Sequence, residues 1–144
     1  MENEKSLPEA TIKKCMSHQI VRVDRGSSVQ EAANKMHREG IKSVLIKDNK
    51  DFVGIISDTD IMFEILITGK DPKQTKVEDI MSEPLVSLDE YETLSKARDI
   101  LREKRFKHLP ISRHGKIVGF LSIKDLISFF AKNPQERRTH TEEA

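Results

Sequence analysis

The stretch GIISDTD, residues 54–60, is followed later in the chain by GFLSIKD, residues 119–125. Both have the pattern of Gly, two apolar residues, Ser, two variable residues and Asp. Two interpretations fit this pattern. The Ser and Asp can cap the start of a helix, or they can form part of a ligand site that occurs twice.

The two stretches belong to a longer internal repeat. Shifting the sequence by 65 positions gives 11 identities across residues 16–61 without a gap, whereas unrelated segments of ordinary composition would give about 3. Apolar residues also align with apolar residues at most of the intervening core positions. The chain is therefore an internal duplication.

Each copy predicts the same order of elements, β-α-β-β-α. Alternating apolar residues and turn residues predict the strands, and apolar residues at helical spacing predict the helices. The predicted elements are a short helical turn (8–15; 77–81), a strand (20–23; 85–88), a helix, a hairpin (43–47 with 52–57; 108–112 with 117–122) and a last helix (58–68; 123–131). Gly40 ends the first of the two helices in the first copy, and Arg105 stands at the equivalent place in the second.

These elements predict an α/β (α+β) fold of two tandem repeats packed with pseudo-twofold symmetry, because a unit of this size buries too little surface alone. The predicted boundaries are an N-terminal tail (1–9), a first repeat (10–68), a linker (69–75), a second repeat (76–131) and a polar, mobile C-terminal tail (132–144).

Composition excludes several classes of function. The net charge is only +1, so the overall balance does not indicate a nucleic-acid or membrane binder. A single cysteine, Cys15, excludes an intrachain disulfide and forms no metal-ligand spacing with the five histidines. No run is long and apolar enough for a membrane span, and the start of the chain lacks a signal-peptide core. We expect a cytoplasmic, non-catalytic protein, since no nucleophile, metal site or phosphate-binding glycine loop is evident.

The local chemistry of Ser57 and Asp60 suits a helix start. Ser57 closes a predicted strand, and Asp60 stands three residues later, where a capping box usually has Glu or Gln. A helix N-terminus also attracts anions, and a carboxylate beside it can accept hydrogen bonds from the paired hydroxyls of a ribose. Gly54 and Gly119 allow either close packing or close approach of a ligand. A cap and a binding site are compatible.

The repeated set of motifs resembles a pair of cystathionine-β-synthase (CBS) domains, together a Bateman module. The resemblance rests on MSxxxVxV near the start of the unit, which residues 16–23 match, HLPI before the hairpin of the second copy and VGxxSxxD at the end of both, and it covers residues 10–131. Many members of that family bind adenine nucleotides or related adenosyl compounds in two clefts between the repeats.

The resemblance implies roles for particular residues. Asp60 and Asp125, with Ser57, Ser122 and Thr59, correspond to ribose-binding positions. The phosphate-binding positions correspond to Lys42, Lys107, His108 and Lys124, and the adenine-binding segments to Gln19, Ile20, Val21 and to Pro84, Leu85, Val86. Lys124 stands where Thr59 stands in the first copy, so the two sites are not equivalent. The second copy offers more cations and is expected to be the better phosphate site, although surface lysines without a ligand are the alternative.

The resemblance implies a stand-alone regulatory module. It would sense AMP, ADP or ATP, in preference to S-adenosylmethionine, without a catalytic cofactor, and would signal by conformational change to an effector protein in trans. Family pairs associate through their helices, which implies a homodimer. The alternative is a ligand-independent dimerising adaptor in which both Ser-x-x-Asp motifs are only caps.

Overall fold

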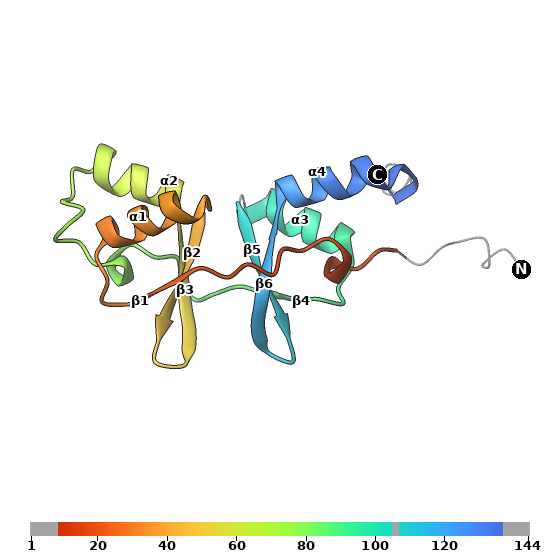
Figure 1. Ribbon diagram of the computed structural model, residues 1–144, viewed down its shortest axis with the longest axis horizontal. Coiled ribbons are helices and arrows are strands. Elements are labelled where there is room, and N and C mark those ends of the chain that lie inside the picture. The colour runs from red at the N-terminus through yellow and green to blue at the C-terminus, as the bar shows by residue number, and fades with distance from the viewer. Residues whose placement is uncertain (1–8, 105–106, 137–144) are drawn as a thin grey trace, which may run out of the picture. The chain divides into compact units, whose positions relative to one another are not determined.

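The computed structural model describes residues 9–104 and 107–136 (Figure 1). The chain forms two compact units. The first unit is Gln19–Val86, and the second unit combines Met1–His18 with Ser87–Ala144. Each unit has a three-stranded sheet and helices, so the predicted mixed α+β fold is confirmed.

The first unit is built around a sheet of order β1-β2-β3, in which β1 runs parallel to β2 and β3 runs antiparallel to it. Apolar positions of the sheet and of α1 meet in a core that includes Val21, Ala32 and Ile56. The elements are β1 (Arg22–Asp24), α1 (Val29–Glu39), β2 (Ser43–Asp48), β3 (Asp51–Ser57), α2 (Asp58–Ile61), the π-helix η3 (Met62–Ile67) and the 3-10 helix η4 (Val77–Asp79).

The second unit repeats this plan with a sheet of order β4-β5-β6 and the same strand directions. Its core includes Ile12, Leu94 and Leu121. The elements are the 3-10 helix η2 (Ile12–Lys14), β4 (Leu88–Asp89), α3 (Leu94–Lys104), β5 (His108–Arg113), β6 (Lys116–Ser122) and α4 (Ile123–Lys132).

The predicted hairpins and helices are confirmed, but the first strand of each copy is shorter than predicted and starts later. In the first copy the ladder begins at Arg22, although the Val21 carbonyl accepts a hydrogen bond from Leu45. In the second copy only Leu88 and Asp89 pair with β5. Pro84 has no N–H to offer a ladder, which disfavours strand pairing in the segment before β4.

The helix ends follow local chemistry. Ser28 caps α1 through a complete capping box, and Gly40 ends it with a left-handed φ of 66°, which glycine adopts without a steric penalty. The predicted different ending at Arg105 lies outside the described residues. The predicted tails, residues 1–9 and 132–144, lie for the most part outside them as well.

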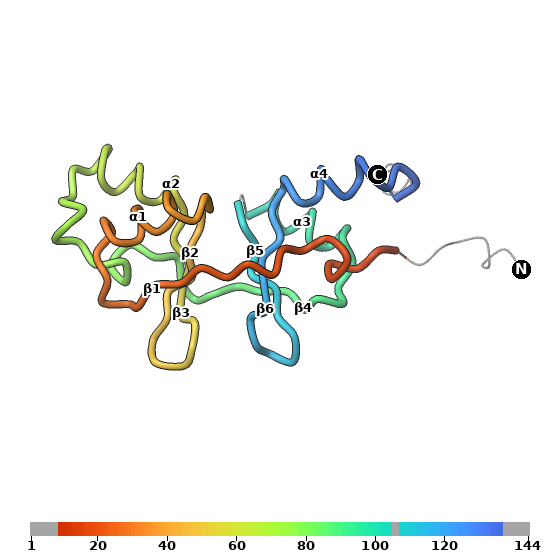
Figure 2. Tube along the Cα trace, viewed as in Figure 1, coloured from red at the N-terminus to blue at the C-terminus, as the bar shows by residue number. Residues whose placement is uncertain are grey.

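The units do not coincide with the two repeats, because the segment that leads into each repeat packs in the unit of the other. We call residues 10–17 and 75–82 the leading segments. In Figure 2 the first, in red, lies against the teal and blue elements of the second unit, and the second, in green, lies against the first unit. Each leading segment also fills the core of its unit, through Ile12 in one case and Val77 in the other.

Equivalent backbone hydrogen bonds attach both leading segments. In the second unit Ser17 and Phe120 exchange two N–H···O bonds of 2.9 Å. In the first unit Ser82 and Ile55 exchange the corresponding bonds, of 2.9 and 3.2 Å. The leading segment is therefore joined by its backbone to the last strand of each sheet, β6 or β3.

Gly119 and Gly54 permit this close approach. A Cβ on Gly119 would overlap the Ser17 carbonyl and lie 2.5 Å from Met16 Cε. A Cβ on Gly54 would lie 2.5 Å from Met81 Sδ and 2.9 Å from the Ser82 carbonyl oxygen. Of the two uses that the sequence left open for these glycines, the structure shows close packing against the leading segments.

We predict that Gly119→Ala lowers the free energy of unfolding by about 1–3 kcal/mol, in the range for overpacked sites. Gly54→Ala should cost less, because its closest contact is with the flexible Met81 side chain and the Ser82 carbonyl oxygen is 2.9 Å away, whereas at Gly119 the closest contact is the Ser17 backbone itself. Gly26→Ala is the control, since nothing lies within 4 Å of the added Cβ. Urea unfolding of the three variants measures this, and equal stability of Gly119→Ala and Gly26→Ala would contradict it.

Candidate functional site

Both Ser-x-x-Asp motifs form complete capping boxes. In the first unit the Asp60 N–H donates to Ser57 Oγ at 3.2 Å, and the Ser57 N–H donates to Asp60 Oδ2 at 2.8 Å. In the second unit the corresponding distances between Ser122 and Asp125 are 3.1 and 2.9 Å. Asp is thus long enough to serve at a position that usually has Glu or Gln.

The capping box uses one oxygen of each carboxylate and leaves the other available. Oδ1 of Asp60 and of Asp125 accepts no hydrogen bond from the residues that the structure describes. Both residues are half-buried, so solvent or a ligand can reach them. An ionised carboxylate oxygen held in place in this way is a hydrogen-bond acceptor for a hydroxyl group.

The predicted phosphate-binding positions lie at the same end of each sheet as the caps. Ser43 pairs with Ser57 across β2 and β3, and the Asp58 N–H donates to the Lys42 carbonyl at 2.9 Å. In the second unit His108 pairs with Ser122 across β5 and β6. Lys107 directly precedes His108, so each unit places a lysine beside the start of its last helix.

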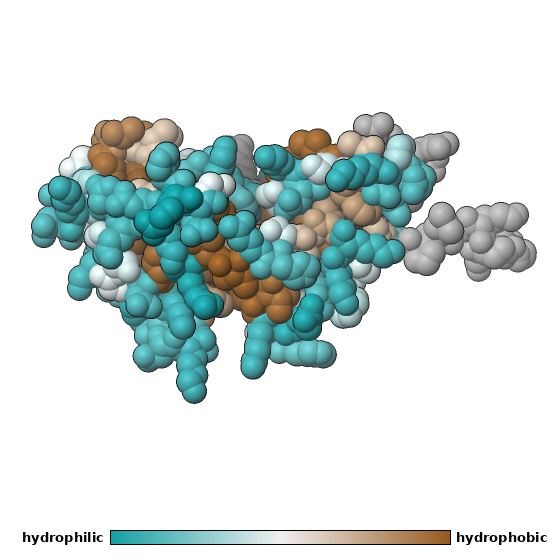
Figure 3. Space-filling model, viewed as in Figure 1, coloured by the Kyte–Doolittle hydropathy of each residue, from teal (hydrophilic) through white to brown (hydrophobic). Residues whose placement is uncertain are grey.

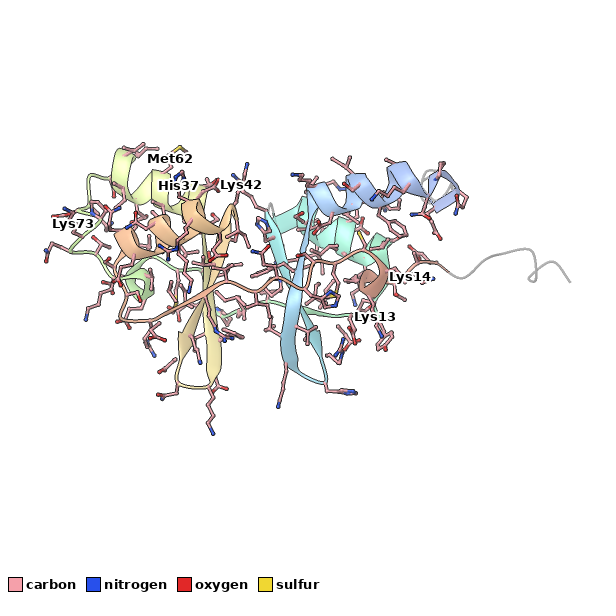
Figure 4. The ribbon with its side chains drawn as sticks, in the orientation of Figure 1. Lys13, Lys14, His37, Lys42, Met62 and Lys73 are labelled. Carbon is pink, nitrogen blue, oxygen red and sulfur yellow. The ribbon has the colours of Figure 1, made fainter. Side chains whose placement is uncertain are left out.

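The side chains near these lysines differ between the units. The ring of His108 lies edge-on to Phe120, with centroids 5.9 Å apart. In the first unit Lys42 lies at the end of α1 near His37, as Figure 4 shows, and both line a mainly apolar pocket of about 260 Å³ with Ile61. Thr59 and Lys124, the inequivalent pair, are both exposed on the first turn of their helices.

The predicted adenine-binding segments divide unevenly between the units. Residues 19–21 and residues 84–86 both belong to the first unit. Val21 is buried beside Leu45 of β2, while Val86 is 41% exposed. The structure therefore brings residues 19–21 into one unit with Asp60, and it does not bring residues 84–86 into one unit with Asp125.

A polar pocket of about 300 Å³ beside Asp125 was not predicted from the sequence. Lys14 and Cys15 of the leading segment line it together with Asp125 and Lys132. The Cys15 thiol donates to the Asp125 carbonyl oxygen at 3.2 Å. Burial, together with the nearby charge of Asp125, raises the pKa of Cys15 to about 12, so the thiol stays protonated at neutral pH and is a poor nucleophile.

Among residues 9–104 and 107–136, no group of three or more His, Cys, Asp or Glu is placed to hold a metal ion. No helix in these ranges is both long and apolar enough to cross a bilayer.

Comparison with known proteins identifies the family. The CBS domain family matches residues 12–67 and 77–132, one match in each repeat. These matches cover most of the sequence, and they agree with the two sheets and their helices. The chain therefore belongs to the CBS domain family, as a tandem pair of its domains.

Two curated relatives match much of the chain. The uncharacterized protein MK0525 of Methanopyrus kandleri is 33% identical over 99 residues, which are 67% of this chain and 50% of that protein. The CBS domain-containing protein YhcV of Bacillus subtilis is 27% identical over 117 residues, 81% of this chain and 83% of that protein. The chain thus spans about half the length of the Methanopyrus relative and most of the Bacillus one.

Solved structures agree with the fold. An uncharacterized conserved protein from Pyrococcus horikoshii superposes with a TM-score of 0.78 at 30% identity, covering 83% of this chain and 91% of that one. The CBS domain pair of protein MJ0100, in complex with 5′-methylthioadenosine and S-adenosyl-L-methionine, superposes with a TM-score of 0.77 at 21% identity, covering 88% and 99%. At 21% identity, the similarity to the MJ0100 domain pair shows a shared fold.

We predict that the two carboxylates stabilise the fold as caps whether or not a ligand binds. Asp125→Ala should lower the free energy of unfolding by about 1 kcal/mol, because it removes half of a capping box. Asp125→Glu should cost much less, since Glu is the usual residue at that place. Chemical denaturation measures both, and an Asp125→Ala chain as stable as the wild type would show that the box contributes nothing.

Proposed function

We propose that this protein is a non-catalytic regulatory module that binds an adenine nucleotide or another adenosyl compound at one or both Ser-x-x-Asp sites. The observation that carries the proposal is the arrangement of Asp60 and Asp125. The capping box fixes one oxygen of each carboxylate and leaves the other accessible beside a helix start. Two adjacent hydroxyls, such as those of a ribose, match such an acceptor.

The surroundings of the carboxylates support an anionic extension of the ligand. Lys42 and Lys107 are exposed at the same sheet ends as the caps. A phosphate near these lysines and near the first N–H groups of α4 would be favoured by charge and by the helix dipole. The MJ0100 domain pair, which has the same fold, was solved with two adenosyl compounds and offers a precedent for the ligand class.

We further propose that ligand binding shifts a conformational equilibrium that a partner protein detects. The shift can be no larger than the difference in ligand affinity between the two states. AMP, ADP, ATP and S-adenosylmethionine each carry a ribose, so each would make the same contact with the carboxylate. The cations of the second copy favour a phosphate-bearing ligand there.

The variant pair at Asp125 distinguishes a ligand site from a cap alone. We expect Asp125→Ala and Asp125→Glu both to weaken binding by about tenfold or more, since a hydrogen bond to a charged group is lost or displaced. Only the Ala variant should lose stability. Isothermal titration with AMP, ATP and S-adenosylmethionine, repeated for the same changes at Asp60, measures this.

A thermal-shift panel gives the first indication. A ligand at 100 times its Kd adds about 2.7 kcal/mol, which raises Tm by about 5–10 °C for a chain of this length. No rise with any adenosyl compound at millimolar concentration would reject the sensor and favour the adaptor. Binding that survives unchanged in both Asp variants would place the ligand elsewhere.

The helix surfaces support self-association as the second part of the proposal, and they also favour the adaptor alternative. Four large apolar side chains of η3 are at least 49% exposed, and Ile127 on α4 is 64% exposed. Figure 3 shows apolar surface over α2 and η3 at the upper left, where Figure 4 labels Met62. The exposed side chains of η3 are Met62, Phe63, Leu66 and Ile67.

We predict that the protein is a homodimer through this surface and that Leu66→Glu produces monomers. Burying a charge in an apolar interface without a partner is unfavourable, so the dimer dissociation constant should rise by at least about tenfold. Gln74→Glu adds the same charge at an exposed position of the linker and should leave the dimer intact. Sedimentation velocity measures both, and a monomeric wild type would contradict the prediction.

A further inference from the structure

The two leading segments carry opposite charges at equivalent positions. The last turn of η2 holds Lys13 and Lys14, whereas η4 holds Glu78 and Asp79. These residues are 65 positions apart, the offset of the duplication. The charges are therefore inverted within an otherwise similar segment.

The charges on the surface that receives each leading segment are inverted as well. In the first unit Arg25 Nη1 binds Asp48 Oδ2 at 2.6 Å, and Arg25 Nε binds Glu78 Oε1 at 2.9 Å. In the second unit the positions of Arg25 and Asp48 are taken by Glu90 and Arg113. Arg113 Nε binds Glu90 Oε2 at 2.6 Å. An ion pair of the same length thus connects the same two places with its polarity reversed.

Lys13 takes the place in the second unit that Glu78 takes in the first, although its ammonium group binds Tyr91 and not the Glu90 carboxylate. Its N–H donates to the Glu90 carbonyl at 2.8 Å, and its Nζ donates to Tyr91 Oη at 3.1 Å and lies 5.2 Å from the centre of that ring. Hydrogen bonds from Arg113 lower the pKa of the Glu90 carboxyl against the opposing effect of burial, and the charges of Lys13 and His18 add to the lowering. Figure 4 shows Lys13 and Lys14 on their leading segment.

Most of the backbone hydrogen bonds that attach the two segments are equivalent, and among the described residues the bond from the Lys13 N–H to the Glu90 carbonyl is an exception, without a counterpart at Glu78. The Ile12 N–H donates to the Glu92 carbonyl, and the Val77 N–H donates to the Ser27 carbonyl, both at 2.9 Å and at equivalent positions. Leu94 donates to Ala10 and Val29 donates to Thr75 in the same way. Since these four contacts are interchangeable, the side chains are the main source of selectivity.

When each leading segment packs in the unit of the other repeat, as observed, its charge faces an opposite charge. If each segment packed in the unit of its own repeat, like charges would face each other in both units. If each leading segment packed on its own repeat, Lys13 would meet Arg25, and Glu78 would meet Glu90. Glu90 is completely buried, so a second carboxylate beside it would be costly. Like charges placed together suppress a wrong pairing more effectively than matched charges strengthen the right one.

We propose that the inverted clusters Lys13–Glu90–Arg113 and Glu78–Arg25–Asp48 direct each leading segment to the unit of the other repeat and exclude it from its own. The inference is independent of any ligand. It assigns these six residues a role in the choice between two nearly identical docking surfaces.

Competition between two disulfides in one chain tests the proposal. Thr11 is bridged to Thr93 in the structure, and Lys76 is bridged to Ser28 at the equivalent place. Directly opposite residues in antiparallel pairs are about 4.5–5.5 Å apart at Cα, which a disulfide can span. The reporter chain carries Thr11→Cys, Ser28→Cys and Thr93→Cys with Cys15→Ala, and peptide mass spectrometry gives the ratio of the 11–93 bond to the 11–28 bond.

In the reporter chain with all six charges intact, position 11 should bond almost entirely to position 93. Adding Lys13→Glu with Glu78→Lys keeps the net charge and should shift the ratio toward the 11–28 bond by about tenfold or more, because both exchanged contacts become repulsive. The control is Lys14→Asp with Asp79→Lys, at exposed neighbouring positions, which should leave the ratio unchanged.

Inverting the charges of both complete clusters distinguishes a loss of charge matching from simple misfolding. A chain that combines Lys13→Glu and Glu78→Lys with Arg25→Glu, Asp48→Lys, Glu90→Lys and Arg113→Glu regains matched charges in the exchanged arrangement. It should recover the 11–93 bond that the swapped chain loses. An unchanged ratio in the swapped chain, or no recovery in the inverted chain, would overturn the proposal.

Discussion

The structure depends on a backbone contact between a leading segment and the last strand of a sheet. Ser17 and Ser82 each exchange two hydrogen bonds with a strand residue next to a glycine, and no side chain at that glycine would fit. This contact holds Met16 and Met81 against their cores and closes one side of each sheet. The last strand then leads directly into the capped helix, so the site is built on the same frame as the core.

The order of elements and the caps could be predicted from the sequence because they depend on neighbours. Ser28 caps the start of α1 and Gly40 ends it, as expected from their local chemistry. The Ser-x-x-Asp motifs form the capping boxes that their spacing indicates. The start of the first strand in each copy could not be predicted, since Ile20 and Leu85 have suitable side chains but no ladder partners. Strand pairing is a property of two segments, and one segment alone does not reveal it.

The exchange of leading segments was outside the reach of a repeat alignment. The predicted boundaries place residues 76–82 in the second repeat, although these residues pack in the first unit. A signal was nevertheless present, because Lys13 and Glu78 differ in sign, as do Arg25 and Glu90. Charge differences between aligned positions in a duplicated sequence can therefore indicate which segments meet. The sequence near Glu90 did not indicate its ion pair, since its partner Arg113 lies at the end of β5, 23 positions later in the chain.

The exchanged architecture bears on the history of the chain. A single ancestral repeat would have lacked its own leading segment in place and would have completed its fold by trading that segment with an identical copy. In such a symmetric pair both segments have one sequence, and both must carry the same charge. Two halves that differ in sequence are free of this constraint, so one segment can be basic and the other acidic. The reversed polarity of Glu90–Arg113 and Arg25–Asp48 is thus a difference that a pair of identical copies could not carry.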